Sequence, residues 1–105
     1  MIQIEQIPID QRIGQAVFAS MPAHWQGAAL TAERKTEGTN ESYRIEISAR
    51  PAAPGIALAS EALELAIREL FLLHRRHKTG MRVAQYFIER AGGQPQLVAE
   101  FKYDD

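Results

Sequence analysis

The chain has 105 residues, of which 46% are hydrophobic and 24% charged, with a formal net charge of −1 and an isoelectric point near 6.3. These values predict one globular domain over residues 1–105, and they exclude a general electrostatic attraction to nucleic acid or an anionic membrane. The chain contains no cysteine, which excludes disulfides and thiolate zinc sites and is compatible with a cytoplasmic location. No apolar run approaches the roughly 20 residues that span a bilayer, so we expect no membrane partner.

The first expected element is a short helix. Residues 1–8 are predicted to be extended or irregular, because Pro8 disfavours a helical conformation of the residue before it. From residue 9 to residue 21 the apolar positions recur with helical period, and Met21-Pro22 would end the helix. The expected buried face comprises Ile9, Ile13, Ala16, Val17 and Ser20.

Two strands are expected next. Residues 28–36 alternate between small or apolar residues and polar ones, and residues 43–50 alternate more regularly. This period of two is typical of antiparallel strands with one buried face. A turn is predicted over residues 37–41, and a rigid loop over residues 51–55.

A second helix is predicted over residues 60–79. Ser60 suits its N-cap, and Gly80 suits the left-handed position just after its end. We expect Leu65, Phe71 and Leu72 to widen its apolar surface, so that more than one side would be covered. The main buried stripe would comprise Leu63, Ala66, Ile67, Leu70, Leu73 and His74.

Two further strands are expected over residues 83–90 and 97–103, joined by a turn at 92–95. The element order is therefore α-β-β-α-β-β. This order predicts an α+β fold, in which two helices pack on one face of an antiparallel sheet of about four strands.

The sequence contains no recognisable catalytic grouping, so we expect no enzymatic activity and no cofactor. His74 and His77 have a spacing that could place two imidazoles near one metal ion, but no carboxylate lies at a matching helical position. We therefore interpret His74 as a residue at the edge of the core and His77 as a residue that complements the helix dipole. His24 and Trp25 are interpreted as structural, with Trp25 filling the core.

The only local run of charge is basic and lies at the end of the second helix. Dipole complementation accounts for most of it. The alternative is a small nucleic-acid-binding or regulatory module, in which these residues would contact phosphates. They are Arg75, Arg76, Lys78 and Arg82.

Several acidic residues occupy strand positions that would point away from the helices. The simplest interpretation is a solvated sheet face, and the alternative is a surface that docks a basic partner such as a nuclease. The acids that we predict to contact a partner are Glu33, Glu46, Glu89, Glu100 and Asp104.

Three motifs in order resemble the YezG-like family of bacterial immunity proteins. The first helix ends in a Met-Pro-x-x-Trp motif, here Met21 to Trp25, and the second helix contains the apolar-rich stretch 62–71. The chain closes with a glycine turn and Phe101-Lys-Tyr-Asp104. The chain departs from the family where a second Trp often precedes the penultimate strand, and in its Pro-rich loop 51–55.

This resemblance implies a cytoplasmic protein that binds and neutralises the C-terminal domain of a cognate toxin, often a nuclease, by stoichiometric occlusion. It implies a protein partner and no cofactor.

Overall fold

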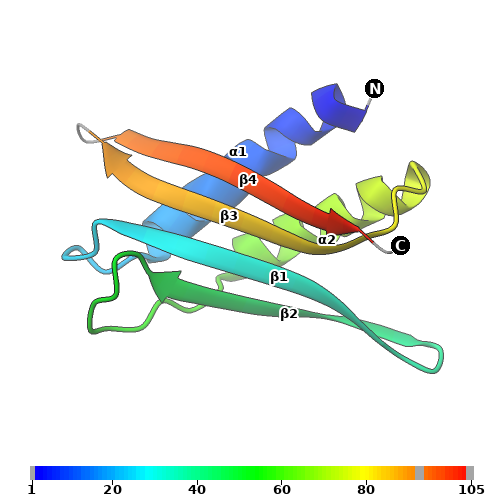
Figure 1. The fold of residues 1–105 in the computed structure, drawn as a ribbon, viewed down its shortest axis with the longest axis horizontal. Coiled ribbons are helices and arrows are strands. Elements are labelled where there is room, and N and C mark those ends of the chain that lie inside the picture. Colours follow the sequence, from blue (N-terminus) through cyan, green and yellow to red (C-terminus); the bar gives the residue numbers. More distant parts are fainter. Residues whose placement is uncertain (1, 92–93, 104–105) are drawn as a thin grey trace.

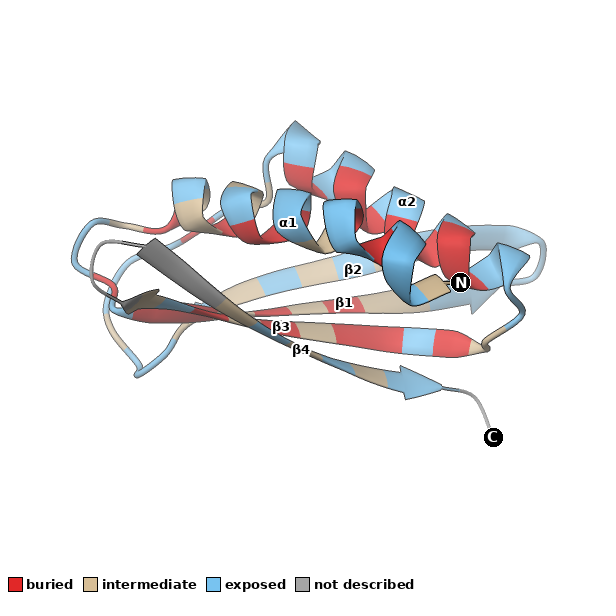
Figure 2. Ribbon diagram, turned by 90° about the horizontal axis from the view of Figure 1, so that it is seen from above, coloured by how far each residue is buried: buried red, intermediate tan, exposed pale blue. Residues whose placement is uncertain are grey.

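The computed structural model describes residues 2–91 and 94–103. Its elements are α1 (Ile2–Ser20), β1 (Gly27–Glu37), β2 (Asn40–Ala49), α2 (Glu61–Arg76), β3 (Met81–Ala91) and β4 (Gln94–Tyr103). The strands form one antiparallel sheet in the order β2-β1-β3-β4 (Figure 1). Both helices lie on the same side of this sheet (Figure 2). The predicted α+β class and element order are confirmed.

Helix α1 begins at Ile2, so the prediction that the first eight residues are extended is wrong for residues 2–8. Contacts with the end of α2 explain the difference. The Glu5 carboxylate lies 3.3 Å from Nε2 of His77, and the buried side chain of Gln6 hydrogen-bonds to His74. These tertiary contacts offset the cost of placing Pro8 inside the helix.

The β1–β2 hairpin is tighter than the sequence indicates. Glu37 pairs with Asn40, so the turn consists of two residues rather than the five predicted. Gly38 has a φ of 61°, which is a left-handed conformation that glycine adopts without steric cost. The register then continues without a break to Ala28 and Ala49.

The N-terminus of α2 agrees with the prediction, whereas its C-terminus does not. The Ser60 side chain caps the helix by accepting a hydrogen bond from the Leu63 N–H at 3.2 Å. The helix ends at Arg76, and Lys78, with a φ of 53°, takes the left-handed position that we predicted for Gly80.

A pair of backbone hydrogen bonds fixes this helix end. The Lys78 N–H bonds to the carbonyl of Arg75 at 3.1 Å, and the Thr79 N–H bonds to that of His74 at 3.1 Å. This is the pattern of a Schellman motif, which satisfies carbonyls that the helix itself leaves unpaired. Gly80 also has a positive φ, but it lies beyond the motif.

The core fills the space between the helices and the sheet. Phe71 is buried as expected, but Leu65 and Leu72 are 53% and 44% exposed, so the predicted widening fails for these two residues. The helices form a single layer, and no described residue packs on the outer side of α2 (Figure 2). The largest fully buried side chains are Trp25, Tyr86, Ile13, Leu30, Leu63, Ile67, Leu70, Leu73, Met81 and Val17.

Trp25 fills the core below the end of α1, as predicted. Its side chain is 2% exposed, and its indole N–H donates to the carbonyl of Pro54 at 2.9 Å. The Arg90 guanidinium donates to the Trp25 carbonyl at 2.7 Å. The Met-Pro-x-x-Trp motif therefore has a structural role, because it ties α1 to the loop before α2 and to β3.

In the described part of the chain, neither helix has the length and apolarity needed to cross a membrane.

Candidate functional site

The face of the sheet that the helices leave uncovered, called the outer face below, brings four of the five predicted partner-binding acids together. The strand register places Glu46 and Glu100 in one row across the sheet, through Thr31 and Gln85. Glu33 lies two residues from this row along β1. Glu89 lies four residues from it along β3, towards the other end of the sheet. Asp104 lies outside the described residues.

Two of these acids have basic neighbours on their own strands. Glu33 lies 2.7 Å from the Lys35 ammonium, and Glu46 lies 2.5 Å from the Arg44 guanidinium. The hydrogen bond and charge of Lys35 lower the pKa of the Glu33 carboxyl. The outer face is therefore mixed in charge rather than uniformly acidic.

Two apolar side chains, Phe87 and Val98, lie side by side on the outer face and are called the apolar centre below. The Arg50 guanidinium lies 4.3 Å from the centroid of the Phe87 ring, and Val98, which pairs with Phe87, is 59% exposed. Together with Glu89 and Glu100, these side chains line a hollow of about 490 Å³. The exposed Val98 and the half-buried Phe87, beside an arginine and two acids, offer a protein partner both area to bury and charges to pair.

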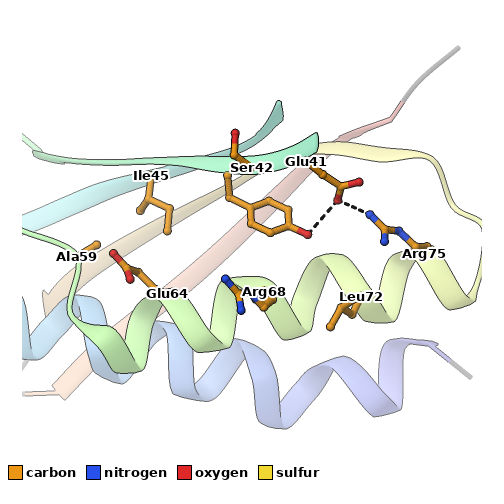
Figure 3. Close-up of a pocket in the computed structure, with 9 residues that line it drawn as sticks. Glu41, Ser42, Ile45, Ala59, Glu64, Arg68, Leu72 and Arg75 are labelled. Atoms are coloured by element: carbon orange, nitrogen blue, oxygen red, sulfur yellow. Dashed lines mark hydrogen bonds and ion pairs between the residues drawn. The ribbon is translucent and has the colours of Figure 1, made fainter. Parts of the chain in front are cut away.

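A second hollow, of about 640 Å³, lies between β2 and α2 (Figure 3). The Tyr43 ring forms part of its lining and stacks on Phe71 with centroids 4.8 Å apart. The Tyr43 hydroxyl donates to the Glu41 carboxylate at 3.0 Å, and Arg75 pairs with the same carboxylate. Burial, and then Glu41, raise the pKa of Tyr43, so its hydroxyl stays protonated at neutral pH.

A chain of hydrogen bonds runs through the edge of the core near His74. Nε2 of His74 donates to the amide oxygen of Gln6 at 2.8 Å, and the Gln6 amide nitrogen donates to Asp10 at 3.2 Å. Asp10 also accepts from the Tyr86 hydroxyl at 2.5 Å. On its other side, Nδ1 of His74 accepts from the Thr79 hydroxyl at 2.8 Å.

This chain is satisfied by a neutral imidazole protonated on Nε2, and the Thr79 hydroxyl also accepts from the Met81 N–H. Burial lowers the pKa of His74, and burial followed by Asp10 raises that of Tyr86. Neither group reaches a described cavity. The chain links α1, α2 and β3, which confirms His74 as a structural residue at the core edge.

The basic end of α2 is partly neutralised by acids from other elements. Arg75 pairs with Glu41, and Arg76 lies 4.0 Å from Glu5. His77 shares that carboxylate rather than acting through the helix dipole alone. The residues proposed for nucleic-acid contact therefore have less positive charge available to pair with phosphates than the sequence indicates.

The described residues contain no group of three or more His, Asp or Glu side chains that could hold a metal ion.

The hollows beside Phe87 and Tyr43 were not predicted from the sequence. In residues 83–90 Val83 and Phe87 belong to the same alternating set as Gln85 and Glu89, so the alternation does not show that an aromatic side chain lies on the outer face. The Tyr43 hollow depends on the position of α2, which no local pattern fixes.

No family model, curated protein or solved structure matches the chain.

Proposed function

We propose that this chain is a cytoplasmic immunity protein that binds a bacterial toxin domain and neutralises it by stoichiometric occlusion. The family resemblance implies that the toxin domain is a nuclease. The observation that carries the proposal is the apolar centre of the outer face. A sheet face that only meets water is expected to be polar, whereas Phe87 and Arg50 are of types enriched at interfaces and Val98 adds exposed apolar area.

The mechanism needs binding and no chemistry. Phe87 and Val98 would be buried against the toxin, and Arg50 would keep its position over the aromatic ring. Glu89 and Glu100 lie beside this centre and would face basic residues of the toxin. A nuclease binds phosphates with such residues, so covering them would block its substrate.

The buried hydrogen-bond chain supports a binding role over an enzymatic one. The two groups whose pKa is shifted, His74 and Tyr86, are enclosed by the core and hydrogen-bonded to protein side chains. Perturbed groups at an active site would need access to a substrate.

The test begins with the neighbouring gene. If it encodes a large secreted protein with a variable C-terminal domain, that domain is purified and titrated with this chain by calorimetry. We expect a one-to-one complex, with F87A and V98E each weakening binding by about tenfold or more. The matched control is L65E, because Leu65 is 53% exposed against 59% for Val98 but lies on α2. Equal effects of V98E and L65E, or no complex, would contradict the proposal.

The predicted acidic contacts have a separate test. Reversing Glu46, Glu89 and Glu100 together should slow association and reduce its dependence on salt, because these charges would steer a basic partner. Unchanged affinity and salt dependence would remove the acids from the interface while leaving the apolar centre in place.

Nucleic-acid binding through the end of α2 is tested by filter binding to RNA and DNA at two salt concentrations. Our proposal predicts no retention that depends on Arg75, Arg76, Lys78 and Arg82. Salt-sensitive binding that R76E abolishes would favour the regulatory alternative.

A further inference from the structure

The two edges of the sheet differ in how far they are protected from pairing. An edge strand presents unpaired N–H and C=O groups, and proteins commonly block it with proline, bulges or charges that point inward. The edge strand β4 contains Pro95, and its pairing with β3 is irregular near Met81. The edge strand β2 contains no proline and pairs with β1 in unbroken register from Asn40 to Ala49.

The outward backbone groups of β2 can be assigned from its ladder. The Arg50 N–H donates to the Gly27 carbonyl at 2.9 Å, so even-numbered residues direct their backbone groups towards β1. Odd-numbered residues then direct theirs away from the sheet. These residues are Glu41, Tyr43, Ile45, Ile47 and Ala49, and within the described chain no backbone hydrogen bond outside the strand ladders involves them.

The side chains of β2 on either side of Ile45 complement one another. If a second β2 strand paired with it in antiparallel fashion, with Ile45 opposite Ile45, Arg44 would lie opposite Glu46 in both directions. Tyr43 would lie opposite Ile47 on the helix side. Both charged side chains are exposed, at 63% and 60%, and within one chain they already pair with each other at 2.5 Å, so each could also pair across the two-fold axis.

Charge also selects this register over its neighbours. Directly opposite residues must share a face, so the next allowed registers are centred on Arg44 or Glu46. The first would place two arginines opposite each other, and the second would place two glutamates opposite each other, both of which are unfavourable. The register centred on Ile45 therefore pairs opposite charges where the adjacent ones pair like charges.

The hollow between β2 and α2 supports the same arrangement. It is lined by Tyr43 and Ile45 from the strand and by Arg68 and Leu72 from the helix (Figure 3). Tyr43, Ile45 and Ile47 are only half-buried, because α2 does not extend over the sheet beyond β2. A second copy that continues the sheet would bring its own α2 to the other side of this hollow and cover these apolar side chains.

We propose that two copies of this chain associate through their β2 edges about a two-fold axis at Ile45, forming one continuous eight-stranded sheet. The helices of both copies would lie on one side, and both outer faces would remain free on the other. The proposal does not depend on the toxin-binding role, because self-association is measured without any partner.

The test is sedimentation equilibrium over a concentration series, with the wild-type chain expected to approach twice its 11.8 kDa mass. R44E and E46R each place like charges opposite one another, and each should weaken self-association by about tenfold or more. An equimolar mixture of R44E and E46R restores two complementary pairs and should dimerise as the wild type does. The double variant R44E/E46R should also dimerise.

K102E is the matched control, because Lys102 is exposed on the outer face of the opposite edge strand and should leave the mass unchanged. Circular dichroism checks that each variant folds. A monomeric wild type at all concentrations, or self-association that R44E leaves intact, would overturn the proposal. Protection of the odd-numbered β2 amides from exchange only when a toxin domain is added would also overturn it, and would assign this edge to the toxin instead.

Discussion

The two faces of the sheet are built from alternate residues of the same strands, and adjacent residues can have opposite roles. Tyr86 is fully buried on the helix side, where its hydroxyl donates to Asp10. Phe87, the next residue, lies on the outer face beneath the Arg50 guanidinium and beside the exposed Val98. The layer that covers a strand, rather than the residue type, therefore decides whether an aromatic side chain stabilises the fold or remains available for a partner.

The largest expected difference between the two faces is in the free energy of unfolding that is lost when an apolar side chain is shortened to alanine. Leu30→Ala, on the buried face of β1, should lower the free energy of unfolding by about 3 kcal/mol, because it leaves a cavity. Val98→Ala on the outer face should cost less than about 1 kcal/mol, because little packing is lost. Urea denaturation measures both values. Equal losses would mean that the outer face contributes to stability as the core does.

The second prediction concerns the Tyr86 hydroxyl. Tyr86→Phe should cost about 2 kcal/mol, since it removes a buried hydrogen bond to a carboxylate. Tyr43→Phe is the control, because the Tyr43 hydroxyl bonds to Glu41 at an exposed site and its loss should be smaller. Denaturant unfolding of the two variants under the same conditions makes the comparison. A larger loss for Tyr43→Phe would contradict it.

The third prediction concerns pH. Because burial lowers the pKa of His74 below its unfolded value of 6.5, the unfolded chain binds a proton that the folded chain resists. His74 should therefore leave stability unaffected above pH 6.5 and reduce it as the pH falls below that value towards the folded pKa. The midpoint of urea unfolding should decrease over this range in the wild type and decrease less in H74Q. An unchanged pH profile in H74Q would show that another group is responsible.

The smallest expected effect lies on the outer face. A double-mutant cycle of Arg50→Gln and Phe87→Leu should give a coupling energy of about 0.5–1 kcal/mol, as expected for an exposed cation–π contact. Thermal unfolding of the four proteins measures the coupling. A value near zero would mean that Arg50 is free to turn towards a partner.

Local patterns predicted most of the fold. Alternation identified β2, and the Ser60 cap and the stripe of Leu63, Ile67 and Leu70 identified α2. The start of α1 was missed because the contacts of its first turn come from the far end of α2, which no window of neighbouring residues contains.

The candidate site was predicted only in part. The alternation of the strands correctly placed Glu33, Glu46 and Glu100 on the outer face. The ion pairs of Glu33 with Lys35 and of Glu46 with Arg44 follow from the spacing of two residues on one strand. The apolar centre was missed, because Phe87 and Val98 come from two different strands and Arg50 reaches them from the bend after β2.

The sequence by itself determined the helices, the strands and which residues alternate, because hydrophobic period, caps and turn residues act over a few neighbouring positions. Only the tertiary structure decided that Phe87 lies on the outer face, how far Leu65 and Leu72 stay exposed, and that β2 forms an open edge. These features depend on where whole elements pack against one another. The two surfaces proposed for binding are therefore defined by what the two helices leave uncovered.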